Sequence, residues 1–395
     1  FMSNLASYTT FYYKNKEKQY DINKFIVSTS DDPGEGEHKI FSYIRDNKIS
    51  HNKEVSMVYG LDADLIMLAL NHLPISKQIY LYRETPEFIK SINRDLEPGE
   101  AYFLDIPKLA QTIRLDMTGT ETISKKQESN RLYDYILLCF FLGNDFMPHF
   151  PSLNIRTGGI HIILAVYKNL FRKSNNNLTN GKIIYWHNVK KLVEQLAEAE
   201  YQNLVNEYNL RSKWEKRRYS SETLEEKMIK LDNIPTKNRE IEKFIDPFNS
   251  GWENRYYKVL FGIDINKYWK KKICMNYLEG LEWTMKYYSS GCVSWDWCYH
   301  YNYPPLWKDL LKYIPSWETT MIEKNNSVPI LPEVQLAYVL PRPSLKLLPN
   351  KFHELLLNNN SENYPTNCRI YWAFCKYFWE SHVDLPPIDL DELKK

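Results

Sequence analysis

The alternation of apolar and polar positions predicts short strands and longer helices along the chain, most clearly in the stretch 55–70. There VSMVY has the pattern of a short buried strand, Gly60 interrupts it, and DLIMLAL continues as an apolar helix. Asp62 and Asp64 stand at the junction of these two elements. Ligands bind at the carboxyl ends of strands in open α/β sheets, so both acids are candidate ligands. The alternative is that they only cap the helix, because aspartate is a common N-cap.

The same pattern predicts further elements on both sides of this stretch. Strands are expected at residues 25–28, 79–82 and 102–104, the last near a sheet edge, and helices at 1–8, 40–44, 131–142, 158–171 and 189–208. The helix at 131–142 is apolar almost all round and should be buried. Strands that alternate with helices in this way predict an α/β fold.

Three further acids lie at the ends of predicted elements. Glu35 and Glu37 stand in DDPGEGEHKI, after the strand at 25–28, where acids also suit the positive end of a helix dipole. Asp145 stands in GNDFMPH, a turn after the buried helix, where Asn and Asp are common for the turn alone. Each acid therefore has an ordinary structural explanation, but all of them occur within one α/β unit.

A cluster of carboxylates predicts a site for hard divalent cations. Mg²⁺ and Mn²⁺ prefer oxygen ligands, and two such ions about 3.5–4 Å apart can hold the attacking and leaving oxygens of a phosphodiester in line. A cluster of like charges is tolerable when such cations neutralise it. The candidate catalytic and metal-binding residues are therefore Glu35, Glu37, Asp62, Asp64 and Asp145.

Composition narrows the class of protein without choosing a function. The 51 basic and 49 acidic residues give a net charge of +2, so a basic surface for nucleic acid requires local segregation of charge. Aromatic residues make up 15% of the chain, which fits large cores and leaves flat faces for stacking bases. The six cysteines have no zinc-like spacing, and the longest apolar run, 135–142, is far shorter than a bilayer requires. We expect reduced thiols in a soluble intracellular protein, cytoplasmic or nuclear, with no membrane contact.

The acidic motifs resemble those of the XRN-type 5′→3′ exoribonucleases, relatives of the flap-endonuclease superfamily. They are PGEGEHKI with Glu35 and Glu37, YGLDADLIML with Asp62 and Asp64, and FLGNDFMPHFPSL with Asp145, and they follow the family's order. The segments 251–264, 277–305 and 336–349 resemble the family's second conserved region. The likeness touches most of the chain and is weak over roughly 185–245.

The resemblance implies an incomplete PIN or flap-endonuclease-like sheet with helices on both faces, followed by a mostly helical second conserved region. It implies that all five acids bind the catalytic Mg²⁺ or Mn²⁺, and that water attacks the first phosphodiester of a single-stranded RNA with a 5′ monophosphate. It also implies that the second conserved region closes over the active site and that one of its aromatics, Trp295 or Trp297, stacks on the terminal base. Core packing is the alternative for at least one of these tryptophans.

The resemblance also suggests how the chain is divided. Residues 1–185 would be the carboxylate-bearing part of the nuclease domain, 186–250 a charged helical connector, 251–345 the second conserved region, and 346–395 the start of a further module. Basic residues at 213–218 of the connector could touch RNA phosphates, although a charge run is usually a solvated face. Aromatic residues at 371–379 have helical spacing and are expected in the core of the last module.

The family's amino-terminal section supplies two further metal-site aspartates and a basic helix that holds the 5′ phosphate. No such segment precedes Phe1, so we expect a truncated nuclease domain with unpaired sheet edges, whose activity needs the absent part. Two other functions stay open: a catalytically dead RNA-binding or scaffold fragment, and a flap-type structure-specific endonuclease. The sequence does not indicate which proteins would be partners.

Overall fold

The structure is a computed structural model that describes residues 2–14, 16–17, 19–85, 89–90, 93–119, 124–359 and 361–394. Its first elements are α1 (Met2–Lys14), α2 (Gly36–Asp46), α3 (Lys48–His51), β1 (Val55–Tyr59), α4 (Asp64–His72), β2 (Gln78–Glu84), β3 (Ala101–Asp105), α5 (Ile106–Thr118), α6 (Lys125–Phe140) and α7 (Gly159–Phe171). The central elements are α8 (Trp186–Glu215), α9 (Leu224–Asp232), α10 (Ile234–Lys237), α11 (Glu240–Ile245), α12 (Trp252–Phe261) and α13 (Lys267–Ser290). The last elements are α14 (Trp307–Leu310), α15 (Pro332–Val339), α16 (Asn350–Asn359), β4 (Arg369–Tyr371), β5 (His382–Asp384) and α17 (Leu390–Leu393).

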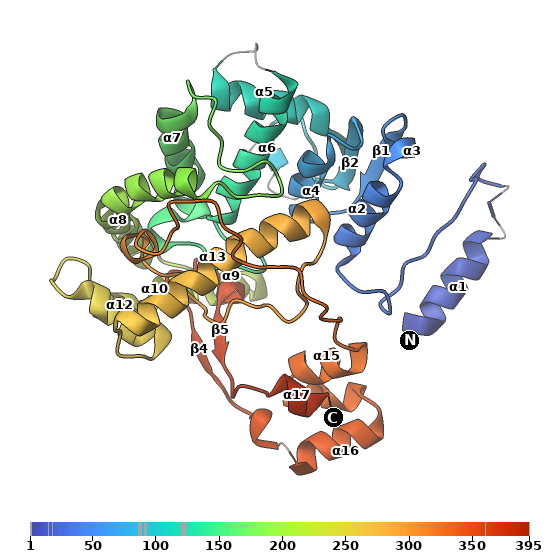
Figure 1. The fold of residues 1–395 in the computed structure, drawn as a ribbon. Coiled ribbons are helices and arrows are strands. Elements are labelled where there is room, and N and C mark those ends of the chain that lie inside the picture. Colours follow the sequence, from blue (N-terminus) through green and yellow to red (C-terminus); the bar gives the residue numbers. More distant parts are fainter. Residues whose placement is uncertain are drawn as a thin grey trace.

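A small mixed sheet organises the first part of the molecule (Figure 1). β1 pairs in parallel with β2, and β2 pairs in antiparallel with β3, so the strand order is β1-β2-β3. The helix α4 makes the crossover that two parallel strands require. The α/β fold and the edge position of the strand near residue 103 are therefore confirmed.

One face of this sheet is exposed. On β1 the side chains of Val55, Met57 and Tyr59 are 56%, 65% and 59% exposed. Tyr82 and Phe103 continue the same face in register with Tyr59, and their rings form an exposed row. Helices such as α4 and α5 pack against the opposite face of β2. The expected helices on both faces are thus found on one face only within the described part of the chain.

Two predictions of secondary structure are wrong. Residues 25–28 are extended, but they belong to no described strand ladder, and Ile26 is half exposed. A strand exists only through its hydrogen-bonded partner, which a local pattern cannot supply. The aromatic segment 371–379 is not one helix either, because β4 ends at Tyr371, Phe374 adopts a positive φ of 63° and only Phe378–Glu380 forms a short 3-10 helix. Phe374 is buried, whereas Trp379 is exposed.

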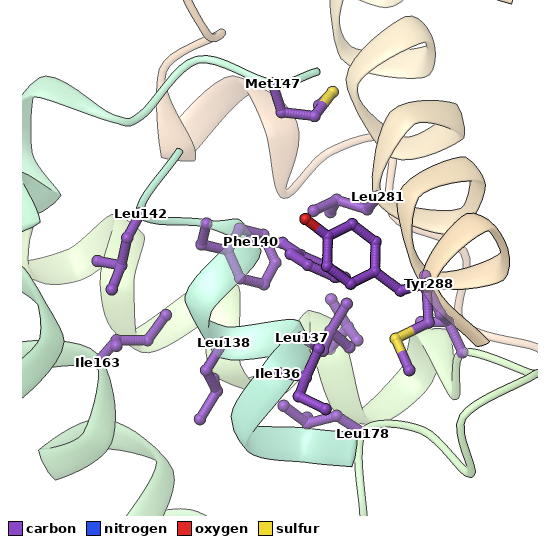
Figure 2. Packing of buried hydrophobic residues seen from close by; sticks show 14 of the residues in the cluster. Ile136, Leu137, Leu138, Phe140, Leu142, Met147, Ile163, Leu178, Leu281 and Tyr288 are labelled. Carbon is purple, nitrogen blue, oxygen red and sulfur yellow. The ribbon is translucent and has the colours of Figure 1, made fainter. Parts of the chain in front are cut away.

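One large hydrophobic core joins the sheet to the helices that follow it. α6 runs through this core, and Figure 2 shows Ile136, Leu137 and Phe140 of α6 close to Leu281 and Tyr288 of α13. The three α6 residues are at most 2% exposed, which confirms the predicted burial of this helix. α13 crosses the middle of the molecule from α12 toward α2 and α4, while α1 stands apart from the other helices (Figure 1).

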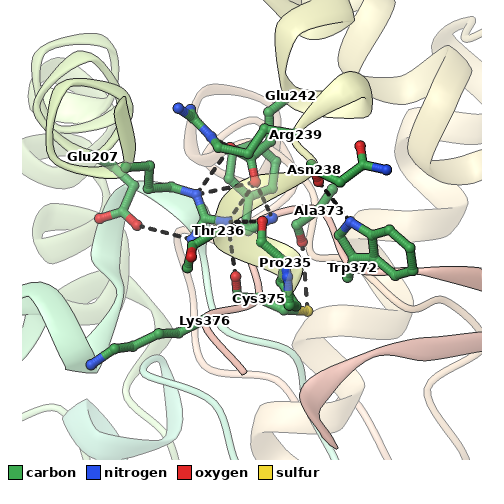
Figure 3. Close-up of polar contacts among 12 residues, drawn as sticks. Glu207, Pro235, Thr236, Asn238, Arg239, Glu242, Trp372, Ala373, Cys375 and Lys376 are labelled. Atoms are coloured by element: carbon green, nitrogen blue, oxygen red, sulfur yellow. Dashed lines mark hydrogen bonds and ion pairs between the residues drawn. The ribbon is translucent and has the colours of Figure 1, made fainter. Parts of the chain in front are cut away.

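A buried ion cluster joins α8 to α11 and to the segment 372–375 (Figure 3). The carboxylate of Glu242 accepts hydrogen bonds from Arg211 Nη2 at 2.6 Å, from Arg239 Nε and from the backbone N–H of Phe374 at 3.0 Å. Arg211 also donates to the carbonyl of Cys375 at 2.8 Å. The predicted charged connector is therefore not solvated throughout, because Arg211 and Arg239 are each buried together with a carboxylate.

Two further observations bear on the expected setting of the protein. All six cysteines are free thiols. Across the described residues, we find no helix with the length and apolar character needed to cross a lipid bilayer.

Candidate active site

The acidic motifs form separate segments whose carboxylates lie close enough for their charges to interact. Glu35 immediately precedes α2, Asp64 begins α4, and Asp145 lies in the turn after α6. The charges of Glu37, Asp145 and Asp64 all act on Glu35, and those of Asp145, Asp62 and Glu37 act on Asp64. The structure therefore brings the predicted acids, which are far apart in sequence, within electrostatic range of one another.

The acids differ in whether their side chains accept hydrogen bonds from nearby backbone N–H groups. Glu35 occupies the N-cap position of α2, but its side chain makes no capping hydrogen bond. At the other turn, Asn144 Oδ1 accepts the N–H groups of Phe146 and Met147 at 2.9 and 3.0 Å, so the turn does not depend on Asp145. Only Asp62 makes the bond expected at a helix start, accepting the N–H of residue 64 at 3.2 Å.

The carboxylates of Glu35 and Asp64 have raised pKa values. Burial raises the pKa of Glu35 to about 7, and the charges of the neighbouring acids add to the effect. Burial is also the main cause that raises the pKa of Asp64, followed by the charges of Asp145, Asp62 and Glu37. Both shifts mean that the charged forms lack sufficient positive charge around them, which is the condition that a bound cation would relieve.

The carboxyl-terminal turn of α13 contributes hydrogen bonds to these acids. The Tyr287 hydroxyl donates to Glu35 Oε2 at 3.4 Å, and the Tyr288 hydroxyl hydrogen-bonds the carboxylate of Asp64. The ring of His38 stacks on Tyr287 at 3.8 Å and lies edge-on to Tyr288. Burial lowers the pKa of His38 to about 4, so the imidazole 3.5 Å from Glu35 is neutral near pH 7.

These aromatic contacts were not among the residues that the sequence singled out. The tyrosine pair lies inside the segment 277–305, and His38 directly follows Glu37, so both occur in motifs with a recognised resemblance. No spacing rule links Tyr287 or Tyr288 to acids more than 200 residues earlier in the chain. Only the packing of α13 against α4 and α6 reveals them.

The donor set suits a hard divalent cation, but the coordination sphere is not closed. Carboxylate oxygens are the ligands that Mg²⁺ and Mn²⁺ prefer, and the candidate site contains no thiolate. Within the part of the chain that the structure describes, no three His, Cys, Asp or Glu side chains converge closely enough to hold a metal ion. The acids thus have the chemistry of a metal site without its complete geometry.

The two candidate tryptophans occupy different environments. Trp297 stacks on Trp283 at 5.2 Å and an interplanar angle of 25°, packs against the large core and has a buried Nε1 without a partner in the described structure. Trp295 instead lies beside Gly34 and lines a small pocket together with Tyr287. Trp295 is therefore the tryptophan next to the acid-bearing segment, and Trp297 is a partly buried residue that packs against the core.

Comparison with known proteins identifies the family. The family model described as "Xrn1 helical domain" matches residues 126–244 and 223–395, and the one described as "XRN 5'-3' exonuclease N-terminus" matches residues 1–85. The chain belongs to the XRN 5′-3′ exonuclease family. The resemblance seen in the acidic motifs is confirmed, and the acids of this XRN-family chain lie in both matched regions, with Asp145 in the helical one.

Named relatives extend the comparison over nearly the whole chain. The XRN-family chain is 27% identical to 5'-3' exoribonuclease 2 of Arabidopsis thaliana, over 95% of this chain and 48% of that protein. It is 27% identical to 5'-3' exoribonuclease 2 of Gallus gallus, over 100% of this chain and 52% of that protein. It is 26% identical to 5'-3' exoribonuclease 1 of Homo sapiens, over 98% of this chain and 25% of that protein. The chain therefore spans about half the length of the first two relatives.

Proposed function

We propose that this XRN-family protein is a metal-dependent 5′→3′ exoribonuclease that hydrolyses single-stranded RNA from a 5′-monophosphate end. The observation that carries the proposal is the mutual approach of Glu35, Glu37, Asp62, Asp64 and Asp145. The curated relatives of the chain are named 5'-3' exoribonucleases, which supports the reaction class. A protein that only bound RNA would have no evident use for carboxylates that repel one another and the RNA backbone.

In this proposal the five acids hold Mg²⁺ or Mn²⁺ in a two-metal arrangement. Such ions, when bound, lower the pKa of water and stabilise charge on the phosphodiester that is cut. Glu35 and Asp64 would bind them as carboxylates, and the repulsion that raises their pKa values would be relieved. Because the described acids do not close a coordination sphere, the proposal includes further ligands from outside them.

The second conserved region has a positioning role in this proposal. The hydroxyls of Tyr287 and Tyr288 orient the carboxylates of Glu35 and Asp64, and the segment after α13 closes over them. Trp295 stacks on the terminal base, since it lies beside the acid-bearing segment, whereas Trp297 is already stacked on Trp283. In this proposal the closed segment excludes a duplex end, which gives the preference for single strands.

Degradation of a 5′-monophosphorylated single-stranded RNA in Mg²⁺ tests the proposal. We expect the full-length protein to release nucleotides from the 5′ end and Asp64→Asn, which keeps the shape of the side chain, to lower the rate by about 100-fold. Glu54→Gln is the control, because Glu54 is an exposed acid just before β1 and outside the cluster. Thermal unfolding of each variant establishes that the fold is retained.

Other outcomes point to other functions. Equal rates for Asp64→Asn and the wild-type protein would overturn the assignment. Tight binding of the RNA without release of nucleotides would support an RNA-binding protein without catalysis, the candidate favoured by the absence of a closed metal sphere among the described residues. Cleavage inside a strand at a junction, rather than from its end, would indicate a flap-type endonuclease.

A further inference from the structure

A small basic pocket adjoins the acids between α2 and the end of α13. It encloses about 100 Å³. Its lining includes Gly34, Lys39, Ser42, Arg45, Tyr287 and Trp295. Two of these side chains are cations and none is a carboxylate, so the pocket differs in charge from the acid cluster beside it.

Arg45 is half-buried in this pocket, and the charge of the exposed Asp46 next to it acts on the guanidinium without forming an ion pair with it. Its Nη1 donates to His72 Nε2 at 2.9 Å, and its Nη2 donates to Ser42 Oγ at 3.1 Å. His72 Nδ1 lies 2.7 Å from the carbonyl of Leu68, so Nδ1 carries the hydrogen and Nε2 accepts from the guanidinium. Among the described residues, no ion pair joins Arg45 to a carboxylate, and burial lowers the pKa of its guanidinium. His72 and Ser42 thus fix the orientation of the Arg45 guanidinium, but as neutral groups they do not balance its charge.

Lys39 supplies a second cation to the same pocket. Its ammonium donates to the carbonyl of Thr29 at 2.6 Å, which uses one of its three hydrogens. Its charge acts on the exposed Asp32 from a distance, but the two side chains form no ion pair in the described structure. Glu35 of the active site contacts His38 and Tyr287, and these two side chains line the pocket. Lys39 and Arg45 therefore leave donors available toward the cavity.

We propose that this pocket binds a phosphate group of the RNA strand, separate from the phosphodiester that is cut. A partly buried guanidinium that forms no ion pair is unfavourable, and its planar fork matches a phosphate in two parallel hydrogen bonds. Trp295 lines the same cavity, so RNA bound against this ring would bring a backbone phosphate downstream of the cleaved bond, which 5′-hydroxyl RNA retains, within reach of Arg45 and Lys39. The inference rests on the proposed function, since it assigns a second contact to the same RNA substrate.

Binding of single-stranded RNA to matched variants tests this site. Measurements use 5′-hydroxyl RNA in Ca²⁺, which takes oxygen ligands as Mg²⁺ does. We expect Arg45→Gln to weaken binding about tenfold and to reduce the slope of log K against log salt by about 0.7, the value for one lost phosphate contact on a single strand. Lys48→Gln removes an equal charge from an exposed position on the neighbouring α3 and should change neither quantity appreciably. Equal losses in the two variants would contradict the inference.

A free nucleotide also carries a phosphate group that could bind this pocket. A second measurement therefore compares the binding of a free nucleotide with that of the RNA strand. If Arg45→Gln loses affinity for adenosine 5′-monophosphate but binds RNA as the wild type does, the assignment to the RNA strand is wrong. Lys39→Gln should weaken RNA binding in the same direction as Arg45→Gln, which provides a second variant if Arg45→Gln does not fold.

A third arm is independent of nuclease activity. Inorganic phosphate, compared with chloride at equal ionic strength, should raise the melting temperature of the wild type and of Lys48→Gln but not of Arg45→Gln. Equal shifts in all three proteins would overturn the site even if RNA degradation were established. Conversely, a difference between the variants without any RNA degradation would support the anion site and contradict the proposed exoribonuclease function.

Discussion

Some side chains of the candidate site carry charge, and others are neutral and pack against the charged ones. Glu35 and Asp64 are acids whose pKa values rise because they are partly buried near other acids. His38 is neutral because burial lowers its pKa, so it contributes ring packing rather than positive charge. Without a bound cation, the candidate site therefore has a net negative charge. Both pH and divalent cations should then affect the stability of the folded protein.

Without divalent cations, the contribution of Glu35 to the free energy of unfolding should fall as pH rises from about 4.5 to about 7, in opposition to that of His38, whose lowered pKa adds stability over the same range. The folded-state pKa of Glu35, about 7, lies above its ordinary value of 4.5, so the stabilising contribution of its proton is complete below 4.5 and lost as pH rises through 7. Glu35→Gln should remove this contribution from the profile. Urea unfolding in EDTA across this pH range measures the effect, with Glu54→Gln as control, and an unchanged slope in Glu35→Gln would contradict it.

The tryptophans at 295 and 297 should respond differently to removal. Trp297→Ala removes a partly buried ring that packs against Trp283 and the large core, and should cost about 1–3 kcal/mol of unfolding free energy. Trp295→Ala should lower stability less and weaken single-stranded RNA binding by about 1–3 kcal/mol, the usual value for a stacked base. Chemical denaturation and RNA titration of both variants give the two quantities. If Trp297→Ala binds RNA poorly while remaining stable, the assigned roles are reversed.

Among the elements, α13 has the greatest influence on the site. A Cβ atom added at Gly280 would lie 2.2 Å from Met147 Sδ and 2.9 Å from Trp297 Cη2, so the helix packs tightly against the turn that carries Asp145. One end of the same helix bears Tyr287 and Tyr288, which contact the other two acidic segments. The placement of α13 therefore sets the relative positions of residues from three parts of the chain.

Tyr288→Phe should weaken the response to Mg²⁺ by about tenfold, because it removes a hydrogen bond that orients Asp64 and holds its pKa down. The aromatic ring remains, so stability should change by only about 1 kcal/mol. Nuclease activity measured against Mg²⁺ concentration tests this expectation. Tyr287→Phe is the matched comparison and should have a smaller effect, since its bond to Glu35 is long at 3.4 Å. A larger effect from Tyr287→Phe would contradict this ranking.

At the scale of the whole molecule, two different interactions hold the parts together. The large core links the sheet to α6, α8 and α13 through apolar contacts. The cluster of Arg211, Arg239 and Glu242 instead joins α8 and α11 to the segment near Phe374 through buried charges (Figure 3). The second link depends on every member being paired, because an unpaired buried charge is strongly unfavourable.

Glu242→Ala should therefore destabilise the protein by about 3–5 kcal/mol, since two buried arginines lose their shared carboxylate. Glu240→Ala, an exposed acid two positions earlier on α11, should change stability by only about 0.5 kcal/mol. Urea unfolding of the two variants provides the comparison. Similar stabilities would show that the cluster is not structurally important.

The sequence by itself determined the elements and residue types whose causes are local. β1, α4, α6 and the acids at their ends follow from periodicity, breaking residues and the chemistry of carboxylates, all of which act between near neighbours in the chain. The family resemblance in the acidic motifs came from the same local stretches, and the family comparison confirms it. The metal-binding role assigned to the acids stays a prediction.

Only the tertiary structure decided which distant residues meet. It distinguished Trp295 from Trp297, brought Tyr288 to Asp64, buried Arg211 inside a segment of high charge and left one face of the sheet exposed. Each of these outcomes depends on contacts between residues far apart in sequence, where burial and pairing are set by the packing of whole elements. A local pattern contains no information on such contacts, and for that physical reason the sequence predicted the acids and missed what surrounds them.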